Sequence, residues 1–213
     1  MVMLNRKFSS PHPKAYGKKT NSAGPARTEI VLEIALHYLK PRIWRSFVVP
    51  DGIKLNQLHA VIQTVMGWTD SHLHSFRFGD SEYGVPDDDF AFDPGATESD
   101  VRDERMYRLS DLIKAKGNEF SYTYDFGDSW EHTIVVKAIR PSAGPLKAAI
   151  CTGGARACPP EDCGSYSGYE ELLKALRNPL HPEHESMRDW AGDYDPARFI
   201  LAEVNRQLKR IRV

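Results

Sequence analysis

Apolar and polar positions alternate along the first part of the chain with the two-residue period of β-strands. Residues 29–38 give a strand buried mainly on one face, and Lys40-Pro41 interrupts the pattern. A second strand follows over residues 43–49 and ends at Pro50-Asp51-Gly52. Two such runs separated by turn residues predict a β-hairpin over residues 29–49.

The period then changes to that of an amphipathic helix. Apolar residues recur at three- and four-residue spacing at Leu55, Leu58, Val61, Ile62 and Val65. This spacing predicts a helix over residues 55–66 that stops at Gly67. Residues 71–79 alternate again, which predicts a third strand with His72, His74, Phe76 and Phe78 on one face.

Residues 80–104 follow neither period, so we expect a long excursion there. A short helix capped by Ser110 is predicted over residues 109–115. Residues 120–125 and 130–139 predict a second hairpin around Phe126-Gly127-Asp128-Ser129. A turn of two or four residues would place Asp125 opposite Trp130, and Thr123 opposite His132.

Strand character is lost after residue 141. Residues 151–168 form a loop rich in glycine, proline and cysteine, and helices are predicted over residues 169–177, 183–191 and 196–211. The element order indicates an α+β fold: a mixed sheet of about five strands with a covering helix, in a β-grasp-like order, and a C-terminal helical segment.

Composition is typical of one soluble globular domain, with 41% hydrophobic and 27% charged residues. We expect this domain to span residues 29–213, with the sheet in 29–140 and the cysteine loop and helices in 141–213. No apolar run is long enough to cross a bilayer, and residues 1–10 lack a signal-peptide core. The sequence therefore predicts a cytoplasmic protein that does not bind membranes.

The formal net charge of -1 is a balance between two oppositely charged segments. Residues 1–28 lack a periodic apolar pattern and acidic residues, which predicts a flexible basic arm able to contact nucleic acid without sequence preference. Its basic residues are Arg6, Lys7, Lys14, Lys18, Lys19 and Arg27. Residues 80–104 carry ten acidic residues against Arg102 alone, and this segment would favour a cation over an anionic substrate.

Histidine and aspartate residues gather on the third strand and the second hairpin. They are His72, His74, Asp125, Asp128 and His132. In the predicted register Asp125 and His132 are diagonal neighbours within reach of each other. These side chains offer the ligands of a divalent metal site, or a general acid and base. The alternative is structural, because polar groups beside a Gly-Asp turn commonly hydrogen-bond to its backbone.

The chain has three cysteines, Cys151, Cys158 and Cys163, all within thirteen positions. Their thiolates could hold Zn²⁺ if His181 or His184 supplied a fourth ligand. The spacing lacks the tight cysteine pairs of a zinc knuckle, so buried structural cysteines are the favoured interpretation, and a redox role is a further alternative.

Several motifs resemble the plasmid pRiA4b ORF-3-like family over about residues 29–209. The central one runs from Tyr122 through Asp125-Phe126-Gly127-Asp128-Ser129-Trp130 to His132. A second is the cysteine loop with Cys158-Pro159-Pro160-Glu161-Asp162-Cys163-Gly164, and a third places Phe199 and Asn205 near the C-terminus. Ser165 departs from the pattern, since the family usually has a second glycine there.

The resemblance implies association with mobile elements, because family members are often labelled insertion-element passenger proteins or TnpR-like resolvases. A serine resolvase needs a nucleophilic serine near its N-terminus, and this chain has only Ser9, Ser10 and Ser22 there, within the arm. Three hypotheses follow: a non-enzymatic accessory or interaction protein, a metal-dependent hydrolase that uses the His/Asp cluster, and a structural zinc-loop protein.

Overall fold

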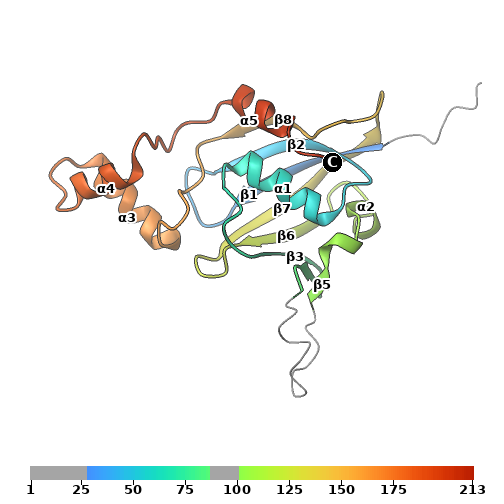
Figure 1. Cartoon of the computed structure of the whole chain (residues 1–213), viewed down its shortest axis with the longest axis horizontal. Helices are drawn as coiled ribbons and strands as arrows, with labels where there is room; N and C mark the ends of the chain where they lie inside the picture. Colours follow the sequence, from blue (N-terminus) through green and yellow to red (C-terminus); the bar gives the residue numbers. More distant parts are fainter. Residues whose placement is uncertain (1–27, 87–100) are drawn as a thin grey trace, which may run out of the picture.

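The computed structural model describes residues 28–86 and 101–213, and its centre is a single eight-stranded sheet (Figure 1). The strands are β1 (Thr28–Leu36), β2 (Trp44–Pro50), β3 (His74–Phe78), β4 (Ser81–Gly84), β5 (Val101–Asp103), β6 (Glu119–Tyr124), β7 (Trp130–Pro141) and β8 (Ile150–Ala155). Their order in the sheet is β5-β4-β3-β6-β7-β1-β2-β8.

Two antiparallel hairpins, β1–β2 and β6–β7, lie side by side and form the middle of the sheet through the antiparallel pair β1–β7. Both hairpins were expected from the alternating pattern, and the α+β class is confirmed. The expectation of about five strands was wrong, and the β-grasp-like order is not confirmed. The additional strands are β4 and β5, which form a parallel pair, and β8, which pairs with β2.

Helix α1 (Leu55–Met66) covers one face of the sheet, as Figure 1 shows, and has the bounds that the sequence predicts. The backbone N–H of Lys54 donates to Oε1 of Gln57 at its start, and Gly67 ends it with a φ of 100°, a conformation that glycine adopts at little cost. Leu55, Leu58 and Ile62 are fully buried against the sheet. Burial stabilises the fold by about 1.5–3 kcal/mol for each such side chain.

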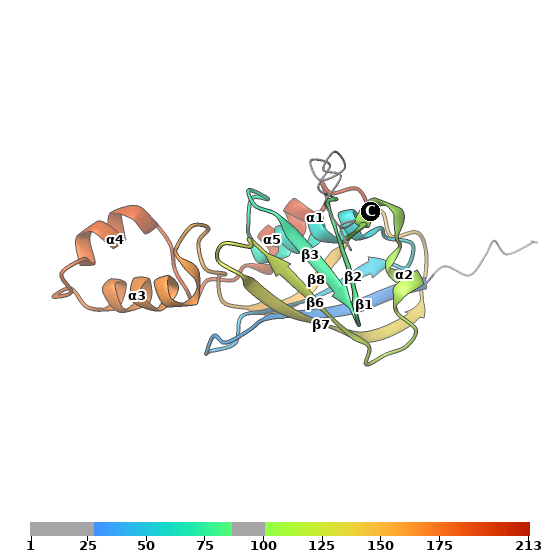
Figure 2. The ribbon, with the colours of Figure 1, turned by 90° about the horizontal axis from the view of Figure 1, so that it is seen from below.

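The other helices are η2 (Glu104–Met106), α2 (Leu109–Leu112), α3 (Ser165–Arg177), α4 (His184–Ala191) and α5 (Leu201–Leu208). Ser110 lies inside α2 and does not cap it, because the helix begins directly after Arg108. Helices α3 and α4 pack on each other and project beyond the sheet, whereas α5 lies beside α1 and β8 (Figure 2). Within residues 28–86 and 101–213, no helix has the length and apolar character to cross a membrane.

The turn between β6 and β7 contains five residues, which corrects the predicted register. Tyr124 pairs with Trp130 and Tyr122 with His132, so Thr123 faces Glu131 instead of His132. Asp125 and Ser129 both have positive φ angles, near 59° and 53°, and these extend the turn by one residue. As a result Tyr122, Tyr124, Trp130 and His132 point into the core, and Asp125 lies beyond the end of β6.

Strand β8 forms one edge of the sheet and was expected to be loop, because Gly153 and Gly154 give it little strand character. Gly154 is required by packing: a Cβ there would lie 2.7 Å from Cδ of Arg45 and 2.8 Å from Cζ of Phe199. On the outer side of the edge, the Asn205 amide of α5 bonds to Cys151 twice, accepting from its N–H and donating to its C=O, both at 2.9 Å.

Candidate metal centre

Asp125 forms the base of the site, at the start of the β6–β7 turn. Its Oδ1 accepts hydrogen bonds from the backbone N–H groups of Gly127 (2.9 Å) and Asp128 (3.3 Å). Its own N–H donates to the carbonyl of Leu73, which ties the turn to the segment before β3. The carboxylate is therefore fixed and nearly buried, and its second oxygen, Oδ2, faces the ring of His72.

His72 and Asp162 complete a three-residue group with Asp125. Nε2 of His72 lies 3.7 Å from Oδ2 of Asp125 and 3.2 Å from Oδ1 of Asp162. The three ligand atoms all lie within 4.8 Å of one another. Nε2 of His72 is buried and makes no hydrogen bond, although both carboxylates lie within ion-pair distance of it. A buried nitrogen that faces two carboxylate oxygens without a hydrogen bond to either is placed as a metal ligand would be.

The site is closed on one side and open on the other. The side chain of Asp125 is 11% exposed and that of His72 29%, whereas that of Asp162 is 74% exposed. Asp162 comes from the loop after β8, where its φ of 60° is uncommon for a residue other than glycine. Solvent or a small ligand can reach the group from the Asp162 side.

Two further carboxylates lie in the segments that build the site. Glu161 accepts hydrogen bonds from the hydroxyl of Tyr124 at 2.5 Å and from Thr69. Partial burial raises its pKa, but the hydrogen bonds from Thr69 and Tyr124 outweigh this and the pKa is lowered, so Glu161 stays ionised. Oδ2 of Asp128 is buried without a hydrogen-bond partner. Glu161 adds negative charge near the His72 side chain.

One imidazole and two carboxylates form a typical ligand set for a divalent cation such as Zn²⁺ or Mn²⁺. Three protein ligands with an open side leave room for water or a substrate group, as in catalytic rather than structural zinc sites. The donor set and the unpartnered nitrogen of His72 therefore fit such a cation.

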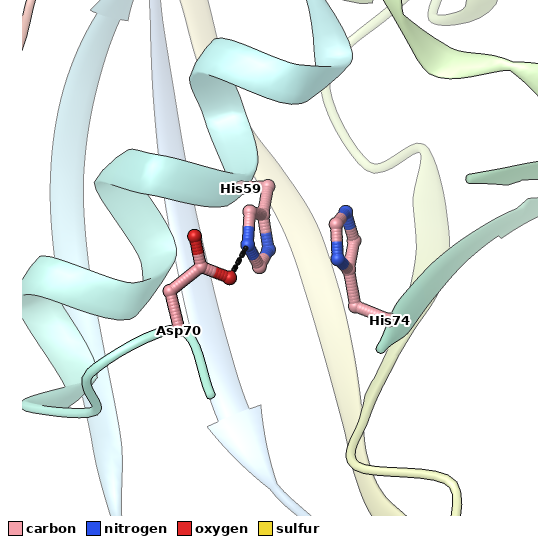
Figure 3. A group of neighbouring side chains, drawn as sticks. All are labelled: His59, Asp70 and His74. Carbon is pink, nitrogen blue, oxygen red and sulfur yellow. Dashed lines mark hydrogen bonds and ion pairs between the residues drawn. The ribbon is translucent and has the colours of Figure 1, made fainter. Parts of the chain in front are cut away.

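His74 belongs to a different cluster, with His59 of α1 and Asp70, which Figure 3 shows. The rings of His59 and His74 stack face to face, with centroids 3.4 Å apart and planes 4° from parallel. A metal ion lies close to the plane of each imidazole that binds it, at about 2.0–2.1 Å from the nitrogen. One ion cannot lie in two parallel planes 3.4 Å apart, so this arrangement does not suit a shared cation.

The stacked histidines instead belong to a buried hydrogen-bond network. Nε2 of His59 bonds to Asp70 at 2.7 Å, Nε2 of His74 bonds to Glu104 at 2.8 Å, and Nδ1 of His59 bonds to the Tyr122 hydroxyl at 2.9 Å. Gln63 donates to the same hydroxyl, which leaves the hydroxyl hydrogen for Nδ1 of His59. Burial, followed by the charge of His74, lowers the pKa of His59, so its ring is neutral at pH 7.

His132 and Asp128 have environments that the predicted cluster did not anticipate. His132 is fully buried: its Nδ1–H donates to the carbonyl of Tyr122 at 3.2 Å, and its Nε2 has no hydrogen-bond partner. The edge of Trp68 packs against the ring. Asp128 lies in the β6–β7 turn, where its backbone carbonyl accepts a hydrogen bond from the Ser165 hydroxyl at 2.7 Å. The five predicted residues thus lie in four different environments, and His72 and Asp125 remain together.

The cysteine loop does not assemble the predicted ligands. Among the described residues, the groups of three or more side chains that could hold a metal contain no cysteine. His181 bonds to Glu171, and His184 bonds to the carbonyl of Ala175. Burial raises the pKa of Cys151, that of Cys158 to about 11 and that of Cys163 to about 12, so these thiols are protonated at pH 7. Cys151 and Cys158 are buried and Cys163 is half-buried, as expected of structural cysteines.

The sequence pattern did not predict that Asp162 belongs to the site. The residue lies in the cysteine-loop motif, but its acidic pair with Glu161 indicates only a turn before a helix. The contact joins positions 37 residues apart in the chain and depends on how the loop after β8 folds back onto the β6–β7 turn. Ser165 adopts a φ of 63°, and the hydrogen bond from its hydroxyl to the carbonyl of Asp128 helps to hold this loop against the turn.

Comparisons with known proteins agree on the family and on the fold. Residues 28–203 match the family described as plasmid pRiA4b ORF-3-like protein. The uncharacterized protein y4hQ of Sinorhizobium fredii (strain NBRC 101917 / NGR234) is 36% identical over 177 residues, covering 82% of this chain and 88% of that protein. The crystal structure of the protein of unknown function MM3350 from Methanosarcina mazei Go1 is 33% identical, with a TM-score of 0.74 over 84% of this chain and 98% of that one.

Proposed function

Since the chain belongs to the plasmid pRiA4b ORF-3-like family, whose relatives named above have no assigned activity, we propose its function from the candidate site. The protein binds a divalent cation, Zn²⁺ in the first place, through His72, Asp125 and Asp162. One observation carries this proposal: the buried Nε2 of His72 faces two carboxylate oxygens within ion-pair distance and makes no hydrogen bond to either.

The residues around the site support a hydrolytic use of the cation. A cation held there would supply Lewis acidity and lower the pKa of a bound water to about 7. Asp125 is preorganised by the two backbone hydrogen bonds that its Oδ1 accepts. Glu161 is ionised and adds negative charge near His72, which favours a cation there.

The experiment measures binding of Zn²⁺ and Mn²⁺ to protein purified without a His-tag, by isothermal titration calorimetry. We expect one equivalent of metal per chain. Replacing a direct ligand in His72→Ala or Asp162→Asn should weaken binding on the order of 100-fold, since weakening even indirect supports of a metal costs 10- to 100-fold. Asp162 is largely exposed, so Asp162→Asn should leave the thermal stability of the metal-free protein unchanged.

Matched controls are His181→Ala and Asp193→Asn, which remove the same kinds of side chain outside the site. They should bind metal like the wild type. The proposal fails if the wild type binds no stoichiometric metal, or if the His72 and Asp162 variants bind as tightly as the controls.

The other expectation from the sequence is a non-enzymatic accessory protein that contacts nucleic acid through residues 1–28, and it stays a prediction. All six basic side chains of that arm lie outside the described residues. The structure therefore adds no argument for or against this role.

A further inference from the structure

A small pocket adjoins the proposed cation site and shares Asp162 with it. The pocket has a volume of about 180 Å³ and lies between the loop after β8 and the helical pair α3–α4. Its lining residues are Asp162, Cys163, Gly168, Leu172, Met187 and Trp190. Apart from Asp162, these side chains are apolar or uncharged.

Close packing of α3 against the loop shapes one wall of the pocket. A Cβ at Gly168 would lie 1.9 Å from the carbonyl oxygen of Cys163, so only glycine allows the helix to approach this closely. One turn later Leu172 is buried. The α3 residues of this wall, Gly168 and Leu172, are apolar and closely packed.

Helix α4 supplies the opposite wall. Met187 and Trp190 are three residues apart and so lie on the same face of the helix. Trp190 is 51% exposed, which is unusual for a large aromatic side chain that could be buried in the core. An exposed tryptophan beside a pocket is typical of a surface that contacts a ligand.

We propose that this pocket is the specificity pocket of the cation site, and that it takes one aromatic ring of a small substrate whose oxygen group binds the cation. The inference rests on the function proposed above. Two observations support it. Asp162 belongs to both the cation site and the pocket wall. The pocket volume of about 180 Å³ is also slightly larger than the cavity of about 150 Å³ that holds one benzene molecule. The substrate class is therefore a small aryl compound with a carboxylate, hydroxamate or similar oxygen donor.

The test compares two zinc-binding probes that differ in this ring, benzohydroxamate and acetohydroxamate, on the Zn²⁺-loaded protein by calorimetry. Filling an apolar pocket with a ring should make benzohydroxamate bind about 10- to 100-fold more tightly. Trp190→Ala should reduce this ratio by about 10-fold and leave the affinity for Zn²⁺ itself unchanged. Met187→Phe should fill the pocket and likewise remove the preference.

Leu180→Ala is the matched control, because Leu180 is an exposed apolar residue in the α3–α4 connection that does not line the pocket. It should keep the wild-type ratio. If Zn²⁺ binds but the two probes bind equally, the pocket inference is wrong and the cation site stands. If Zn²⁺ does not bind at all, the proposed function fails and the pocket inference fails with it.

Discussion

The fully buried His132 makes the stability of this protein depend on pH in a way that can be measured. Burial lowers the pKa of its ring from 6.5 to about 3, and the hydrogen bond to the carbonyl of Tyr122 offsets only part of this. The native state thus resists protonation, whereas the unfolded chain accepts the proton near its ordinary pKa. Stability is complete above pH 6.5 and is lost as the pH falls toward 3.

The magnitude follows from the two pKa values. At pH 5 the unfolded state gains about 2 kcal/mol from protonating this one ring, and the loss grows by about 1.4 kcal/mol for each further pH unit down to about pH 4. The value at pH 5 depends almost entirely on the unfolded-state pKa, because the native ring is still neutral there. His59 acts in the same direction, since burial also lowers its pKa.

The perturbation is His132→Asn, whose side-chain N–H can keep the donor to Tyr122 without titrating. Urea unfolding is followed at several pH values between 7.5 and 4, with His181→Asn as control. The variant should be less stable than the wild type at pH 7.5, and its stability should fall less steeply, by about 1.4 kcal/mol per pH unit between pH 6 and 4. Parallel stability curves for wild type and His132→Asn would refute the reasoning.

Two further substitutions test contacts that hold the site in place. Tyr122→Phe removes the hydroxyl shared by His59 and Gln63 and leaves both buried groups without this partner. The free energy of unfolding measured in urea should fall by about 1–3 kcal/mol. An unchanged urea midpoint would exclude the network. Gly168→Ala places a Cβ 1.9 Å from the carbonyl oxygen of Cys163 and should lower the melting temperature by several degrees. The control Gly144→Ala has open space around its Cβ and should keep the wild-type melting temperature. Equal melting temperatures for the two variants would contradict the close packing.

Sequence periodicity identified the elements that bury one regular face. The bounds of α1 and the existence of the two hairpins follow from this, because alternation or three- and four-residue spacing is a local signal. Strand β8 gave no such signal: its Gly154 fits against Arg45 and Phe199, a requirement set by residues far away in the chain. Short strands such as β5, with three residues, carry too little pattern to recognise.

The candidate site was predicted in part for the same reason. His72 and Asp125 flank strands whose pairing the pattern indicates, and the structure brings them together. The five-residue turn, with positive φ at Asp125 and Ser129, changed the register and turned His132 into the core. Asp162 approaches through an irregular loop, and no periodic signal reports such a contact.

The amide of Asn205 at the outer side of β8 has a consequence for solution behaviour. A free strand edge offers unpaired N–H and C=O groups to other chains and promotes aggregation. Asn205 occupies both groups of Cys151, as a neighbouring strand would, so a second molecule would have to displace α5 before it could extend the sheet there. This one side chain therefore protects the edge against sheet growth between molecules at the position of Cys151.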